Sequence, residues 1–234
     1  MGLPLIIHSA PSPNFDERHT DVDTVILHYT GMQTGAAALA RLRDPAARVS
    51  AHYLVEEDGM VFSLVEEEKR AWHAGVSSWK GETNLNARSV GIEIVNPGHE
   101  WGYRPFPDDQ IDAVCRVLHD TVARWSISLN RVLGHSDIAP HRKDDPGELF
   151  PWNQLADLGL AVGPFVGAPD PSILYEDALT ALNDIGYDAP DGRHAACVLA
   201  FQRRFCPASL GQALDPLTKA AILWTKSKMV DRGA

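Results

Sequence analysis

The sequence has few cysteines, no long apolar run and no excess of basic residues. Its three cysteines, Cys115, Cys197 and Cys206, are too sparse for a disulfide framework, so we expect buried thiols, with a Cys197–Cys206 pair as the less favoured alternative. The N-terminal apolar run covers only Leu3 to Ile7 and has no basic region before it, which is not typical of a signal peptide. We therefore expect no membrane span and a cytoplasmic protein. A periplasmic or outer-membrane location is the alternative if a signal peptide has been removed.

Acidic residues outnumber basic ones, 31 to 21, which leaves a formal net charge of −10. Because such a surface repels phosphate backbones, we expect no nucleic-acid partner. The hydrophobic fraction of 44% is ordinary for a globular protein, and no low-complexity run indicates disorder. A chain of 234 residues is long enough for one sizeable domain and a small second one.

Hydrophobic periodicity predicts an α/β domain in the first two thirds of the chain. Short apolar segments rich in β-branched residues predict strands at 24–30, 89–96 and 131–133, and a hairpin within 50–65. Apolar residues recur at helical spacing between Ile111 and Trp125, which predicts an amphipathic helix. Strands mixed with helices indicate an α/β domain built around one sheet.

The remaining third begins with a segment dense in glycine and proline, at 163–171, which we interpret as a linker. Beyond it, helical patterns cover 172–185, 194–205 and 215–226, the last of them opening with an Asp-Pro pair suited to a helix start. The predicted organisation is therefore a domain at 1–162, a linker at 163–171 and a small three-helix domain at 172–234.

Two features point to metal chemistry. His28 interrupts an apolar strand, where an imidazole is costly unless it is paired or binds a metal. A short polar loop at 134–152 then contains His135, Asp137, His141, Lys143, Asp144 and Asp145. A solvated charged loop is the alternative interpretation. Two histidines and one carboxylate with an open position form a typical catalytic zinc site, and no cysteine lies nearby to suggest a structural one.

Six segments, taken in order, resemble the zinc-dependent N-acetylmuramoyl-L-alanine amidase family, which also contains phage lysozyme-type amidases and peptidoglycan recognition proteins. They are SPNFDER, VILHYT, SAHYLVEEDGMVFSLV, AWHAGVSSWKG, LNARSVGIEIVN and GHSDIAPHRKDDPGELFPW. The resemblance implies a mixed central sheet flanked by helices. It also implies hydrolysis, by a zinc-activated water, of the amide between the muramoyl lactyl group and L-alanine.

Carried over residue by residue, the resemblance makes His28, His135 and Asp145 the zinc ligands. Glu93 matches the family's catalytic glutamate, and Lys143 its catalytic lysine, which suits stabilisation of an oxyanion. A surface lysine that neutralises its acidic neighbours is the alternative for Lys143. Phage-type relatives have a catalytic tyrosine where this chain has Ala51, so the resemblance is to the muropeptide-recycling and lipoprotein branch.

Five further residues are candidates for substrate binding: His52, Trp72, His73, Asn86 and Arg88. Aromatic faces suit sugar rings, and an arginine suits the carboxylates of a stem peptide. Simple packing is the alternative for Trp72, and support of the sheet is the alternative for His52.

The C-terminal segment resembles a small peptidoglycan-binding domain through Asp191-Gly192, AACVLAFQRRF and DPLTKAAILW. A second Asp-Gly turn is absent, so wall binding and simple packing both stay open. The expected partner is a muropeptide or peptidoglycan, with 1,6-anhydro-muropeptides in recycling as the favoured substrate. An exported amidase that trims intact peptidoglycan and a non-catalytic recognition protein are the alternatives. The oligomeric state is left open.

Overall fold

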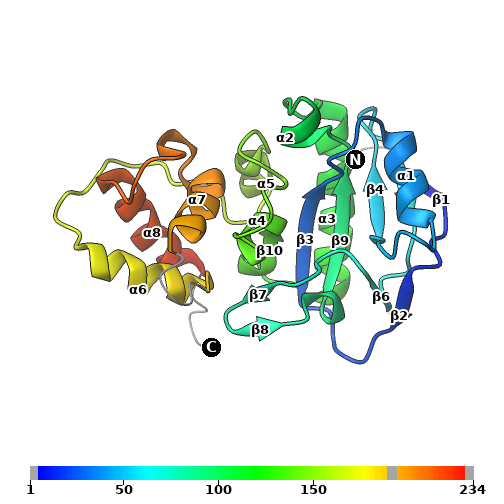
Figure 1. Ribbon diagram of the computed structural model, residues 1–234, viewed down its shortest axis with the longest axis horizontal. Helices are drawn as coiled ribbons and strands as arrows, with labels where there is room; N and C mark the ends of the chain where they lie inside the picture. The colour runs from blue at the N-terminus through cyan, green and yellow to red at the C-terminus, as the bar shows by residue number, and fades with distance from the viewer. Residues whose placement is uncertain (1–4, 189–193, 230–234) are drawn as a thin grey trace.

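In the computed structural model, which describes residues 5–188 and 194–229, a six-stranded sheet forms the centre of the part of the chain that precedes the three C-terminal helices (Figure 1). The strand order is β1-β5-β4-β9-β3-β10. These strands are β1 (Ile7–Ser9), β3 (Thr24–Tyr29), β4 (Tyr53–Val55), β5 (Val61–Ser63), β9 (Ser89–Ile94) and β10 (Val132–Gly134). Two small sheets pair β2 (Phe15–Glu17) with β6 (Lys69–Ala71) and β7 (Ser78–Trp79) with β8 (Glu82–Thr83).

The central sheet is mixed, as the sequence predicted. Neighbouring strands run parallel except β4 and β5, which form the antiparallel hairpin predicted within 50–65. Gly59 has a φ of +82°, a conformation that glycine adopts without strain. The strands predicted at 24–30, 89–96 and 131–133 are confirmed as β3, β9 and β10.

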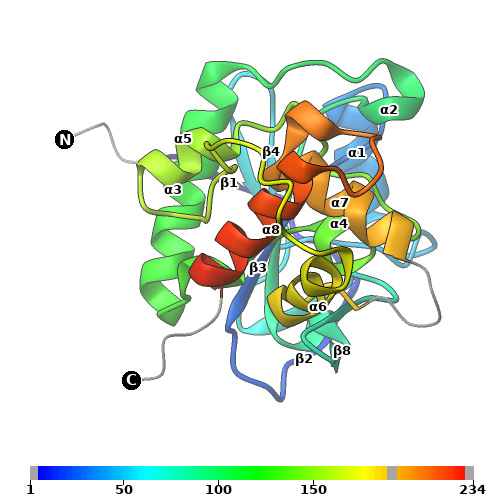
Figure 2. The same ribbon diagram turned by 90° about the vertical axis from the view of Figure 1, so that its left-hand side faces the viewer.

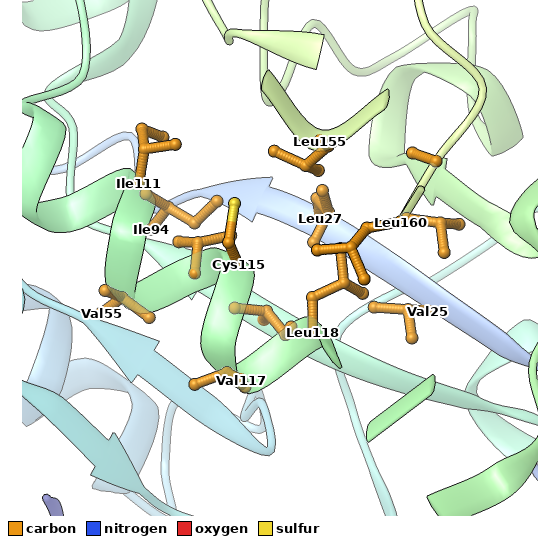
Figure 3. Packing of buried hydrophobic residues seen from close by; sticks show 14 of the residues in the cluster. Val25, Leu27, Val55, Ile94, Ile111, Cys115, Val117, Leu118, Leu155 and Leu160 are labelled. Atoms are coloured by element: carbon orange, nitrogen blue, oxygen red, sulfur yellow. The ribbon is translucent and has the colours of Figure 1, made fainter. Parts of the chain in front are cut away.

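Alternation along β3 and β9 gives the sheet two different faces. Val25 and Leu27 of β3, with Val90, Ile92 and Ile94 of β9, belong to the apolar cluster covered by α3 (Asp108–Trp125) (Figure 3). The intervening residues of both strands face the other way, and they include His28 and Glu93, which are direct partners in the β3–β9 register. The titratable side chains of His28 and Glu93 therefore lie on the face of the sheet opposite α3.

We call the chain before residue 163 the first part. Its helices begin with α1 (Gly35–Arg43), whose start is capped by the Thr34 hydroxyl, which accepts a hydrogen bond from the Ala37 amide at 3.1 Å. Short helices follow at α2 (Gly98–Trp101), α4 (His135–Ile138) and α5 (Trp152–Asp157), with 3-10 turns η1 (Leu85–Ala87) and η2 (Leu129–Arg131). The sequence prediction lacked α1, because its apolar residues are mostly alanines and give little amphipathic signal.

The three C-terminal helices match their predicted positions: α6 (Tyr175–Ile185), α7 (His194–Phe205) and α8 (Pro216–Met229), with a 3-10 turn η4 (Pro207–Ser209). Asp215 caps α8, since its carboxylate accepts a hydrogen bond from the Thr218 amide at 2.8 Å. Asp191 and Gly192, part of the resemblance to a peptidoglycan-binding domain, lie outside the described residues. We call the segment that contains these three helices, residues 172–229, the helical tail.

The helical tail packs against the edge of the sheet formed by β10 and α4 (Figures 1 and 2). One buried cluster includes Leu133 and Ile138 of the first part together with Leu182 and Phe201 of the tail. Trp79 lies so close to Gly186 that a β-carbon there would be 2.6 Å from its ring. The tail and the first part therefore share a hydrophobic core, while the predicted domain limits stay a prediction.

All three cysteines lie within the described ranges, and each is a buried thiol without a disulfide. Among the helices of the described part, none is long and apolar enough to cross a membrane.

Candidate metal centre and active site

Three side chains from three different segments converge on one point. His28 comes from β3, His135 is the first residue of α4, and Asp145 lies in the loop that follows. The Nδ1 atoms of the two histidines are 2.9 Å apart, and the Asp145 Oδ2 atom lies 3.1 Å from His28 Nδ1 and 3.0 Å from His135 Nδ1. All three residues are buried.

This donor set fits a zinc ion. Zinc–nitrogen bonds of about 2.0–2.1 Å in a tetrahedral site place neighbouring ligand atoms roughly 3.3 Å apart, close to the distances found here. Two nitrogens and one carboxylate oxygen leave a fourth position, as in catalytic rather than structural zinc sites. The outer ring nitrogens are also held, since His135 Nε2 lies 3.1 Å from the Ala74 carbonyl oxygen and His28 Nε2 lies 3.1 Å from His73 Nδ1.

The outer contact of His28 continues into a chain of hydrogen bonds. When Nδ1 of His28 presents its lone pair to the centre, Nε2 carries the hydrogen and donates to His73 Nδ1. His73 Nε2 then donates to the Ser89 hydroxyl at 3.3 Å, and that hydroxyl donates to the Leu85 carbonyl at 2.6 Å. The chain ends on a fixed backbone acceptor, so it favours the tautomer of His28 that a metal requires.

Protonation states also suit metal binding. Burial, reinforced by the charge of His135, lowers the pKa of His28 to about 4, so its ring is neutral at pH 7. Burial opposes ionisation of Asp145, but the two histidines outweigh it and hold the pKa of its carboxyl well below the usual range. A neutral imidazole and an ionised carboxylate are the forms that coordinate cations.

Glu93 lies beside this cluster and lines the same cavity of about 200 Å³. Its Oε2 atom is buried without a hydrogen-bond partner among the described residues. Burial, and then the negative charge of Asp145, raises the pKa of Glu93 to about 8. A carboxyl group with a pKa near neutrality and an unused oxygen is suited to accept and return a proton.

Lys143 lines both this cavity and an adjoining, wider one of about 530 Å³. Its loop is held by backbone hydrogen bonds from the Lys143 amide to the Ala139 carbonyl at 3.1 Å and from the Ser136 amide to the Asp145 carbonyl at 2.8 Å. The ammonium group is therefore carried on an anchored segment beside the candidate metal ligands.

The wider cavity brings together three of the five residues predicted to bind substrate, namely Trp72, His73 and Asn86. The Trp72 indole donates to Asp16 at 2.7 Å. The Asn86 side-chain oxygen accepts from the His73 and Ala74 amides at 3.0 and 2.7 Å, so it fixes the backbone that carries His73. Trp72 and Asn86 thus shape the wall of the groove.

The other two predicted substrate residues line neither cavity. His52 is fully buried, accepts from the Gly91 amide at 2.9 Å and contacts the Arg18 guanidinium and the Lys69 carbonyl. Arg88 pairs with Asp23 and with Glu82. Their roles in substrate binding stay predictions, and these placements favour support of the sheet instead.

Sequence reasoning missed three cationic residues of the groove, Arg48, Arg70 and Arg142. They come from separate segments, and no spacing in the sequence links them. Arg142 stood within one of the segments that carry the family resemblance, which is the only signal for any of them. It also donates to the Val76 carbonyl at 2.8 Å.

The cavity is lined by a buried cluster of two histidines and one carboxylate, by a lysine, and by a glutamate with one oxygen unpaired among the described residues. These groups define a candidate metal-dependent hydrolase. Comparison with known families is consistent with this class, because residues 18–148 match the family model described as N-acetylmuramoyl-L-alanine amidase. That match covers more than half of the chain. The chain belongs to the N-acetylmuramoyl-L-alanine amidase family and is an amide hydrolase of that kind.

Relatives extend the likeness beyond that span. The N-acetylmuramoyl-L-alanine amidase AmiD of Escherichia coli (strain K12) is 36% identical over 224 residues, which cover 85% of this chain and 80% of AmiD. A structure of E. coli AmiD complexed with anhydro-N-acetylmuramic acid-L-Ala-D-γ-Glu-L-Lys matches with a TM-score of 0.80 and 32% identity, over 93% of this chain and 98% of that one. Pseudomonas aeruginosa AmpDH3 complexed with an anhydromuramic pentapeptide matches with a TM-score of 0.77 and 34% identity, over 87% and 90% of the two chains.

Proposed function

We propose that this amidase hydrolyses the bond between the lactyl group of a 1,6-anhydro-muropeptide and L-alanine, with zinc held by His28, His135 and Asp145. The observation that carries the proposal is the convergence of the three ligand atoms, all within 4.8 Å of one another, on the cavity that Glu93 lines. The similarity to two structures that contain anhydromuramyl peptides supports the choice of substrate.

Each reacting group has a residue suited to it. His28, His135 and Asp145 would hold the zinc ion, which would supply a Lewis acid for the amide carbonyl and would make water more acidic. Glu93 accepts the proton of the attacking water and delivers it to the departing alanine nitrogen, a role suited to a carboxyl whose pKa burial raises toward neutrality. Lys143 stabilises the negative oxygen of the tetrahedral intermediate, an interaction worth on the order of 3 kcal/mol.

The groove beside these residues receives the substrate in this proposal. The Trp72 ring offers an apolar face to the sugar, while Asn86 and His73 keep the wall in place. Arg48, Arg70 and Arg142 make this groove cationic although the whole chain is acidic. Such a lining attracts the carboxylates of a peptide stem.

One experiment tests the proposed function. The protein is incubated with an anhydro-muropeptide, and the free stem peptide is measured by mass spectrometry with and without a chelator. We expect cleavage at the lactyl–alanine bond, its loss on chelation and its return when zinc is restored. Full activity after exhaustive metal removal would contradict the zinc assignment. Binding of the muropeptide without any cleavage would instead indicate a recognition protein.

A second candidate function is the trimming of intact peptidoglycan. It is favoured by the resemblance of the helical tail to a small peptidoglycan-binding domain, which rests on AACVLAFQRRF and DPLTKAAILW. Rates on isolated sacculi and on dissolved anhydro-muropeptides, measured with the same preparation, separate the two candidates. We expect the dissolved substrate to be cleaved faster, and a preference for sacculi would reverse the assignment.

The compartment follows from the favoured substrate, and we propose the cytoplasm. The supporting observation is that all three cysteines are buried thiols, which suits a reducing compartment. Fractionation of the native host is the test. Recovery of the protein in the periplasm or the outer membrane would overturn this proposal and favour the peptidoglycan-trimming role.

A further inference from the structure

Two consecutive arginines of the helical tail reach into the active-site segment. Arg203 and Arg204 lie near the end of α7, with only 8% and 2% of their surfaces exposed. Both extend toward residues 135–148, the segment that carries His135, Lys143 and Asp145. Arginine is rarely buried unless its charge is paired, so the partners of these two residues are informative.

Arg204 secures the start of this segment. Its guanidinium pairs with Asp137 and donates to the Val132 carbonyl at 2.9 Å, and it lies 3.9 Å above the Trp152 ring. The same Asp137 carboxylate accepts from the Gly134 amide at 2.8 Å, which caps α4 directly before His135.

A second tail residue acts on the same carboxylate. The Tyr187 hydroxyl donates to Asp137 Oδ1 at 2.5 Å, and the tyrosine is completely buried. Asp137 is therefore held from the tail at both oxygens, because Arg204 pairs with its Oδ2 atom. Any rotation of α4 that moved His135 would break these charge-assisted contacts.

Arg203 secures the other end of the segment. It forms ion pairs with Asp144 at 2.8 Å and with Glu148 at 3.5 Å. Asp144 stands between Lys143 and Asp145, so its position limits where both neighbours can lie. Arg203 and Arg204 thus reach opposite ends of one loop from adjacent positions on one helix.

We propose that Arg203 and Arg204 are positioning residues that hold the loop 135–148 in the geometry needed for metal binding, which makes the helical tail a structural part of the active site. This inference rests on the proposed metal site. Metal ligands need support from surrounding hydrogen bonds, and loss of such support typically weakens metal affinity by about 10–100-fold. A tail that served only to attach the enzyme to the wall would not need buried charges directed at the catalytic loop.

Hydrogen exchange of the full-length protein, with and without a chelator, tests the positioning directly. We expect Arg203→Met to speed exchange of the amides in 142–148 about tenfold or more, while exchange in α3 stays unchanged. Lys226→Met is the matched control, since Lys226 pairs at 2.6 Å with the exposed Asp184 within the tail and does not reach the loop. Wild-type exchange in 142–148 of a folded Arg203→Met protein would overturn the inference.

Zinc affinity and kinetics give the second measurement. Arg203→Met should weaken zinc binding about tenfold or more in a competition with a chromogenic chelator, and lower kcat with little change in KM. Arg203→Lys should recover part of both losses, because it keeps the charge but not the planar guanidinium. Adding Asp144→Asn to Arg203→Met should have no further effect, since both changes remove the same ion pair.

The two measurements separate failure of this inference from failure of the proposed metal site. Wild-type protein that binds no zinc would refute the metal site, while the exchange rates would still decide whether the arginines hold the loop. Zinc affinity and kcat that match wild type in Arg203→Met would overturn the inference with the metal site intact. Arg204→Met is the more severe change, because Arg204 is more deeply buried than Arg203. If Arg204→Met does not fold, the decisive test is Arg203→Met, since the Asp144 partner of Arg203 is exposed.

Discussion

The two faces of the central sheet bury different kinds of side chain, although the same strands build both. Toward α3, strands β3 and β9 present valine, leucine and isoleucine side chains to an apolar core (Figure 3). Toward the opposite face, the alternate positions of the same strands carry His28 and Glu93. At Gly91 on this face, a β-carbon would lie only 2.4 Å from the His73 ring.

Because of this difference, one face of the sheet contributes mainly to stability and the other carries the groups suited to catalysis. The face against α3 is uniform, so its side chains contribute mainly by leaving water. The opposite face holds imidazole and carboxyl groups whose pKa values are shifted by burial and by one another. Substitutions on the first face should change the free energy of unfolding, and substitutions on the second should change catalysis.

The largest expected effect is the loss of turnover in Glu93→Ala, on the sheet face that carries His28 and Glu93. Turnover should fall by about 10³-fold or more, because the proton acceptor is lost, while zinc stays bound. Steady-state kinetics and metal analysis of the purified variant measure both. Glu66→Ala, which removes an exposed carboxylate outside the cavities, is the control and should have wild-type turnover. Loss of zinc from Glu93→Ala would show that Glu93 is a ligand.

Leu118→Ala tests the apolar face. Leu118 of α3 is fully buried, so the substitution should lower the free energy of unfolding by about 3 kcal/mol through lost burial and a cavity. Denaturant unfolding measures this, and kcat of the folded variant should match wild type. The control is Leu158→Ala, at a leucine with 63% of its surface exposed, where we expect a change below about 0.5 kcal/mol. A large fall in kcat for Leu118→Ala would mean that the faces are not separable.

Lys143→Ala changes a loop residue that lines the same cavity as His28 and Glu93, and its expected effect on turnover is smaller. Turnover should fall by about 10²-fold, as expected when a stabiliser of the oxyanion is removed, with KM little changed. Lys226→Ala on the tail serves as the control for loss of a lysine. An increase confined to KM would instead assign Lys143 a plain role in substrate binding.

The smallest expected effect is a pH-dependent gain in stability from Glu93→Gln in the metal-free protein. The folded-state pKa of Glu93 is about 8, against 4.5 for an ordinary glutamate, so the folded state holds this proton more tightly than the unfolded state. The stabilisation by that proton is fully present below pH 4.5 and is lost as the pH rises through about 8.

Glu93→Gln stays neutral and avoids this loss. The variant should therefore equal wild type near pH 4.5 and be more stable by about 2 kcal/mol near pH 9. This is less than the full pKa shift would give, because Glu93 as a whole residue is half-buried although its Oε2 atom is buried. Urea unfolding at the two pH values in the presence of a chelator measures the difference. Glu66→Gln should change the free energy of unfolding equally at both pH values. If Glu93→Gln also did so, ionisation of Glu93 would not destabilise the folded protein, and the prediction would be wrong.

Much of the fold was predictable from local patterns. Strands β3 and β9 and helix α3 were found close to their observed limits, since short β-branched apolar runs and a period-3.6 apolar pattern both indicate burial. The tail helices were found from helical patterns as well, and α6 ends at Ile185, the limit predicted for it. Helix α1 was not predicted, because its alanines give only a weak amphipathic pattern. The two-residue strands β7 and β8 are too short to show any periodicity.

The candidate site was predicted in a different way, by resemblance to a family over ordered motifs. From the residues alone, His28 and the charged loop at 134–152 each had an ordinary alternative interpretation. The structure resolves part of this by bringing His28 within 3.1 Å of Asp145, a residue 117 positions away. It also places Trp72 in the lining of the groove, whereas His52 and Arg88 line neither of the two cavities.

The sequence by itself determined which segments form strands and helices and which residue types are available for metal chemistry, because both depend on neighbours within a few positions. Only the tertiary structure decided which of those residues meet. The partners of Asp137 and Asp144 on α7 lie some 60 residues further along the chain, and no local pattern encodes that pairing. Burial and charge pairing at such separations arise when distant segments pack together, so the attachment of the helical tail to the catalytic loop becomes visible only in the folded molecule.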